Sequence, residues 1–78
     1  MDDDVVRCAV GQRLRLRRRR LGLTQMEVGA RCGVTFQQIQ KYETGAATVS
    51  VSRLLMLAAA LGTSVEDLVR GLQHHVGN

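Results

Sequence analysis

Two helix starts lie close together between residues 24 and 45. Thr24 is a good helix N-cap, and Glu27 stands three residues after it, which is the spacing of a capping box. Gly33 can take the left-handed backbone conformation that ends a helix. The same capping spacing begins again at Thr35, so a second helix starts almost at once. Two capped helices with so short a connection must cross at a steep angle, as in a helix-turn-helix unit. The fold must therefore be one that contains such a unit.

The second of these helices has two unlike sides when its residues are placed about 100° apart. Its inner side carries Thr35, Ile39, Tyr42 and Glu43. Its outer side is polar and rich in amides, and comprises Gln37, Gln40, Lys41 and Thr44, with Phe36 on the flank. Such a face is typical of a solvated surface helix. It also suits a DNA major groove, because glutamine offers adenine a donor and an acceptor together, and an apolar side chain can contact the thymine methyl.

The rest of the chain contains only helical signals. Its 78 residues include no proline, one tyrosine and one phenylalanine, and no stretch alternates polar and apolar residues as a strand does. This length suits one domain, residues 1–78, with an aliphatic core. Because a chain so short often shares apolar surface with a partner, a dimer is expected.

Three further helices are expected on either side of this pair. The first is capped by Asp4 and reaches about Gly22, with an apolar face of Val6, Val10, Leu14 and Leu21. The fourth, over residues 51–61, is apolar nearly all round and should be the central helix. The fifth, over about residues 64–72, starts with a capping box and carries more apolar residues than a monomer of this size can bury.

Positive charge is concentrated in one block. Ten of the eleven cationic side chains lie within residues 7–53, which contain only Glu27 and Glu43 as carboxylates, and ten of the eleven are arginines. The arginine fork matches phosphate geometry, so a polyanionic partner is expected. Six arginines between residues 13 and 20 fit a solvated helix face, and they also fit an RNA-binding helix. Arg17 and Arg18 fall on or beside the apolar stripe, where a charge needs a partner.

Several functional classes find no support in the residues. His74 and His75 are adjacent and diverge on a helix, and no triad or phosphate loop is present, so no metal, cofactor or enzyme activity is expected. Cys8 and Cys32 form no C-x-x-C pair, and they should be reduced and at least half-buried. The acidic N-terminus and the lack of a long apolar run predict a cytoplasmic protein without a membrane span.

Three segments of the chain resemble Cro/repressor-type (Xre-type) helix-turn-helix transcriptional regulators. They are VGQRLRLRRRRLGLTQ, VGARCGVTFQQIQKYETG and VSRLLMLAAALGTSVEDL, and the resemblance covers about residues 9–70. It implies an all-α, five-helix, lambda-repressor-like domain with its helix-turn-helix at about residues 24–43. It further implies a bacterial or phage regulator, a repressor, that binds a palindromic operator in double-stranded DNA as a homodimer.

The resemblance also implies roles for individual residues. Bases would be read by Phe36, Gln37, Gln40 and Lys41, where Phe36 would pack on a thymine methyl or else cover the core. Phosphates would be held by Thr24, Gln25, Arg19, Arg20, Thr48, Ser50 and Arg53, with a share for Arg13. A buried ion pair would join Arg18 to Glu43. The dimer interface, on the helix at about residues 64–72, would contain Leu68, Val69 and Leu72.

Two other functions remain open on these residues alone. An antitoxin, or another protein-interaction module, would place its apolar C-terminal face on a protein partner. An RNA binder would use the arginine-rich first helix. No small-molecule ligand is expected, because no second domain is available to hold one, and regulation would then come from protein concentration or from a partner protein.

Overall fold

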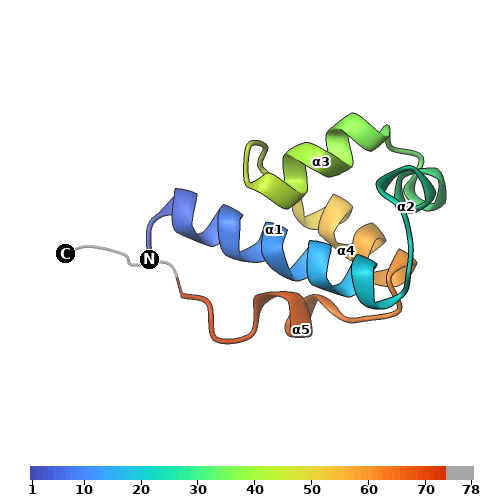
Figure 1. Ribbon diagram of the computed structural model, residues 1–78. Coiled ribbons are helices and arrows are strands. Elements are labelled where there is room, and N and C mark those ends of the chain that lie inside the picture. The colour runs from blue at the N-terminus through green and yellow to red at the C-terminus, as the bar shows by residue number, and fades with distance from the viewer. Residues whose placement is uncertain (74–78) are drawn as a thin grey trace.

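The computed structural model describes residues 1–73, which form five helices and no β-strand. These are α1 (Asp3–Arg20), α2 (Gln25–Cys32), α3 (Phe36–Thr44), α4 (Val51–Ala60) and α5 (Val65–Val69) (Figure 1). The expected all-α, five-helix fold is confirmed. Within this part of the chain, none of the helices has the length and apolar character needed to span a bilayer. The expectations for His74 and His75 lie outside the described residues.

The paired helices α2 and α3 begin and end at the predicted residues. The Thr24 hydroxyl accepts a hydrogen bond from the backbone N–H of Glu27 at 3.0 Å, and the Glu27 carboxylate accepts one from the Thr24 N–H at 3.1 Å. Gly33 ends α2 with a φ of 68°. Thr35 caps α3 by accepting from the backbone N–H three residues on, at 3.2 Å. A Cβ at Gly29 would lie 2.3 Å from a carbonyl oxygen of this turn, so only glycine allows the two helices to approach so closely.

Both ends of α1 differ from the expectation. Asp2, and not Asp4, caps the helix by accepting from the backbone N–H three residues on, at 2.9 Å. Asp4 lies in the first turn, where the helix dipole favours a carboxylate. At the other end the helix stops at Arg20, so Leu21 becomes the C-cap residue. Its side chain is therefore 43% exposed and does not join the core.

Helix α1 lies between α3 and α5, which contact it on opposite sides (Figure 1). It meets α3 at Gly11, where a Cβ would lie 2.4 Å from the Tyr42 carbonyl oxygen and 2.6 Å from that of Glu43. Glycine weakens a helix interior by roughly 0.5–1 kcal/mol relative to alanine. At this position it also permits backbone contact between the two helices.

The core is aliphatic, as expected, but α4 is not its centre. Buried residues from all five helices form the core: Val10, Leu14, Val28, Cys32, Ile39, Tyr42, Leu57, Ala58, Leu61 and Leu68. Helix α4 packs on α2 and α5, and its outer face stays in solvent, with Val51 75% exposed and Leu55 and Met56 also exposed. The prediction of a central α4 is wrong, because no element of residues 1–73 covers that face.

The two cysteines are free, and they differ in exposure. Cys32 is buried, and burial raises the pKa of its thiol. Cys8 is exposed, contrary to the expectation, because it lies at the side of α1 where α3 ends. Its Sγ is 3.9 Å from the Thr44 carbonyl oxygen.

Candidate nucleic-acid interface

The outer face of α3 is a row of exposed polar side chains. Gln37, Gln40, Lys41 and Thr44 are all exposed. On the inner side Ile39, Tyr42 and Glu43 are buried. This division agrees with the prediction except at Thr35, which is exposed as the N-cap. The amides and the ammonium group are therefore free to meet a ligand without disturbing the core.

A buried ion pair joins α1 to α3, as the resemblance implied. Arg18 donates from Nε to Glu43 Oε2 at 2.6 Å and from Nη2 to Glu43 Oε1 at 2.9 Å. The side chains of Arg18 and Glu43 are only 12% and 3% exposed. The hydrogen bond to Glu43 raises the pKa of Arg18, although burial opposes this. Such a bidentate pair has one favourable geometry, so it fixes the orientation of α3 on α1.

Gln25 connects the start of α2 to the same carboxylate. Its Nε2 donates to Glu43 Oε1 at 3.1 Å, while Arg18 Nη1 donates to the Leu23 carbonyl at 2.9 Å. An amide nitrogen carries two N–H groups, so one N–H of Gln25 is not used by this bond. Gln25 is also the first residue of α2, where the N–H groups that a helix leaves unpaired favour an anion.

The loop after α3 presents two more of the predicted phosphate contacts. Thr48 and Ser50 are exposed, and Ser50 caps α4 by accepting from the Arg53 N–H at 3.1 Å. The guanidinium of Arg53 turns inward, where Nη1 donates to the Cys32 carbonyl at 3.4 Å. One nitrogen of the Arg53 guanidinium is therefore used to join α4 to the end of α2.

Most of the arginines bind groups within the domain, which their sequence pattern did not reveal. Five of them donate to carbonyl oxygens at the ends of helices, where the helix dipole favours a cation. Arg53 does so at the end of α2, as described above, and Arg7 Nε reaches Gly45, the C-cap of α3, at 3.2 Å. Arg13 reaches Leu68 at 3.2 Å and Arg70 at 2.6 Å, Arg17 reaches Leu61 at 2.8 Å and Gly62 at 2.9 Å, and Arg31 reaches Ala60 at 2.9 Å. Arg17 thus has the partner that its position requires.

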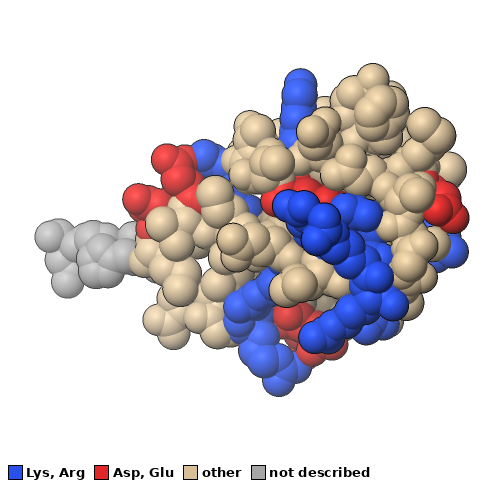
Figure 2. Space-filling view, viewed as in Figure 1, with Lys and Arg blue, Asp and Glu red and all other residues tan. Residues whose placement is uncertain are grey.

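Arg15, Arg19 and Arg20 have no hydrogen-bond or ion-pair partner within residues 1–73. Arg15 and Arg19 are one helical turn apart, on the flank of α1 that adjoins α3. Arg20 lies on the opposite flank, beside Arg13 and Arg17. Figure 2 shows lysine and arginine side chains gathered over α1 and α5, with a separate basic projection beside α3. Arg15 is the residue that the sequence reasoning missed, although its spacing of four from Arg19 is a recognisable signal.

Two exposed apolar side chains belong to the helix-turn-helix. Phe36 is 41% exposed and is not one of the buried core residues, so much of its ring is open to a ligand. Met26, next to Gln25 in α2, is also exposed and was not singled out from the sequence.

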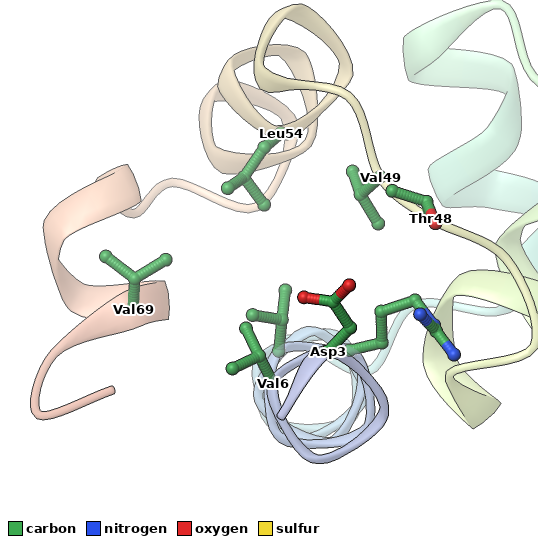
Figure 3. A pocket seen from close by; sticks show the side chains of 8 residues that line it. Asp3, Val6, Thr48, Val49, Leu54 and Val69 are labelled. Atoms are coloured by element: carbon green, nitrogen blue, oxygen red, sulfur yellow. The ribbon is translucent and has the colours of Figure 1, made fainter. Parts of the chain in front are cut away.

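The residues expected at a dimer interface lie in different environments. Leu68 does not fit that role, because it is 3% exposed and packs in the core of the protomer. Val69 and Leu72 are half-buried, and α5 ends earlier than expected, at Val69. Val69 lines a pocket of about 330 Å³ between α1, α4 and α5, with Val6, Val49 and Leu54 on its other walls (Figure 3).

The capped helix pair, the exposed amide face of α3 and the ion pair beneath it define a helix-turn-helix DNA-binding domain. The chain belongs to the Cro/repressor-type (Xre-type) family of helix-turn-helix transcriptional regulators, and residues 9–71 match the family described as a helix-turn-helix domain. As a member of this family it is a DNA-binding transcriptional regulator and not an enzyme.

Bacterial regulators are similar in sequence. A transcriptional regulator in the ATPase CF(0) region of Rhodospirillum rubrum is 49% identical over 72 residues, which covers 87% of this chain and 67% of that protein. An HTH-type transcriptional regulator of Sinorhizobium medicae is 50% identical over 56 residues, which covers 72% of this chain and 40% of that protein. The chain thus spans less than half the length of the second relative.

Solved structures of regulators share the fold. The clp gene regulator ClgR of C. glutamicum superposes with a TM-score of 0.80 at 31% identity, covering 87% of this chain and 96% of that one. The restriction-modification controller protein C.AhdI of Aeromonas hydrophila gives 0.76 at 33% identity, over 78% and 92% of the two chains. The P22 c2 repressor, in complex with a synthetic operator, gives 0.74 at 32% identity, over 80% and 94%.

Proposed function

We propose that this chain is a repressor that binds a palindromic operator as a homodimer and places α3 in the major groove of each half-site. The outer face of α3 is the observation that carries this proposal. Gln37, Gln40 and Lys41 are exposed on this helix. Its orientation is fixed by Glu43 on the buried side, which accepts hydrogen bonds from α1 and α2. Their donors and acceptors match base edges, and the exposed ring of Phe36 suits a thymine methyl.

Phosphate contacts would position α3 without reading sequence. The groups proposed for this are the exposed Thr24, Thr48, Ser50 and Arg19, the half-buried Gln25 and, in addition to the residues expected from sequence, the exposed Arg15. Arg53 joins them only if it leaves its carbonyl partner. Arg20 belongs to the other flank of α1, so it is left out of the proposed set.

A second copy of the chain would cover the apolar surface that α4 and α5 leave open. Val51 and Leu55 are exposed on α4, Val69 is half-buried at the end of α5, and Leu72, also half-buried, lies after that helix. This surface replaces Leu68 in the proposed interface. The operator complex of the P22 c2 repressor, which has the same fold, supports operator binding by this chain.

Selection of bound sites from random DNA duplexes at physiological salt tests the proposal directly. The expected result is a palindrome whose half-sites are about 34–36 Å apart, together with sedimentation as a dimer. A protein that binds every duplex alike would contradict sequence-specific recognition. Retention by structured RNA, but not by duplex DNA, would instead favour the RNA-binding alternative, although Arg13, Arg17 and Arg18 are already bonded within the domain.

The variant Gln37→Ala separates base reading from general affinity. It should lose roughly 1–3 kcal/mol of binding free energy, and the loss should fall on one or two base positions of the selected site. Gln73→Ala is the matched control, since it removes an exposed amide at the far end of the described chain. An equal loss on all sequences would remove Gln37 from the set of reading residues.

A further inference from the structure

A second pocket, of about 270 Å³, opens between α1 and α5 on the side of α1 that faces away from α3. Arg13, Arg17 and Arg20 line one wall, and Thr63 and Asp67 line the other. We propose that this pocket binds a phosphate group, either as free phosphate or as a small phosphate monoester. The site is separate from the DNA interface and goes beyond the proposed function.

The three guanidinium groups share one face of α1. Positions 13, 17 and 20 are spaced by four and three residues, so their side chains stack along one side of the helix. Arg13 and Arg17 are held in place by carbonyl oxygens at the ends of α5 and α4. These acceptors are uncharged, so they fix the positions of the cations and leave their charge uncompensated. Cations held in position before the ligand arrives lose less entropy on binding.

Asp67 is the one carboxylate that lines this pocket. Arg70 Nη2 donates to its Oδ1 at 2.7 Å, and the Thr63 hydroxyl lies 3.5 Å from its Oδ2. The hydrogen bond from Arg70 holds the pKa of Asp67 below its usual value, so the group is a carboxylate at neutral pH. Because Arg70 already pairs with it, the three arginines on α1 remain in excess.

The chemistry of the pocket selects an oxyanion of small size. Arginine binds phosphate through N–H donors and a full positive charge. Arg20 has all its donors free, and Arg13 and Arg17 keep those that do not bond to the carbonyl oxygens. Leu16 is 58% exposed at the rim and gives an organic substituent an apolar surface. DNA held by α3 cannot supply this phosphate, because α3 packs on the other side of α1 through Gly11 and Arg18.

Inorganic phosphate, titrated into the full chain at constant ionic strength, tests this site by NMR. Saturable shifts are expected at the amides of residues 13–20 and 61–68. Arg20→Gln should weaken binding by about tenfold, since it removes one charged donor and no bond within the domain. Arg19→Gln is the matched control, because it removes the same charge from the next residue on the other flank and should change the affinity less than about twofold.

The outcomes separate this site from the proposed function. Shifts that do not saturate, or equal losses in the two variants, would show a diffuse counter-ion atmosphere and overturn the proposal. Operator affinity should stay unchanged in Arg20→Gln, and a loss there would return Arg20 to the DNA interface. Phenyl phosphate identifies the source: tighter binding than inorganic phosphate assigns the site to a monoester, and equal binding assigns it to free phosphate.

Discussion

Removal of the Glu43 carboxylate should both destabilise the domain and weaken its binding to DNA. Glu43→Ala deletes two hydrogen bonds from Arg18, at 2.6 and 2.9 Å, and one from Gln25 at 3.1 Å. It leaves the Arg18 cation, whose side chain is 12% exposed, without a counter-charge. Breaking a buried pair in this way costs about 3–5 kcal/mol. Since Arg18 keeps its bond to the Leu23 carbonyl and some contact with water, the lower figure is expected.

That loss is large for a chain of this length. Domains have about 0.05–0.15 kcal/mol of stability per residue, so 78 residues correspond to roughly 4–12 kcal/mol. A loss of about 3 kcal/mol would lower Tm by roughly 12–24 °C. Urea denaturation followed by circular dichroism measures the change, and operator binding is then compared at a temperature where both proteins are folded. The folded variant should still bind DNA, but less tightly, because α3 has lost its attachment to α1 and α2.

A double variant shows whether the two charges act as a pair. Arg18→Met combined with Glu43→Leu removes both charges and fills the space with apolar side chains, which should recover most of the lost stability. If Glu43→Ala instead lost less than about 1 kcal/mol, or the double variant were as unstable as the sum of the single ones, the ion pair would not be what positions α3.

Three further predictions concern single residues. Gly11→Ala should lose about 1–3 kcal/mol in denaturation, because its Cβ would overlap carbonyl groups of α3, and a gain would show that α3 can move away. Hydrogen bonds from Thr24 lower the pKa of Glu27 in the folded state. The stability that the ionised Glu27 carboxylate contributes is therefore present above its unfolded pKa of about 4.3, and it is lost as the pH falls through the folded value. Glu27→Gln should therefore flatten the loss of stability between about pH 5 and pH 3. Arg19→Gln should make the slope of log K against log salt shallower by about 1, and Arg20→Gln should not.

The local devices of the fold are legible in the sequence. The capping box at Thr24 and Glu27, the left-handed Gly33 and the restart at Thr35 each act within four residues, so no distant contact is needed to specify them. The division of α3 into two faces follows from helical period alone. The pairing of Arg18 with Glu43 came from charges on apolar faces and from the family resemblance together, and the structure confirms it.

Tertiary packing decided what those local signals leave open. Helix α1 contains seven arginines, yet four of them bind groups elsewhere in the domain and three do not, because only the docking of α3, α4 and α5 brings acceptors within reach. The exposure of α4 and the burial of Leu68 depend in the same way on which faces the neighbouring helices cover. Periodicity states that a helix has an apolar face, but which element covers that face depends on contacts between residues far apart in the chain.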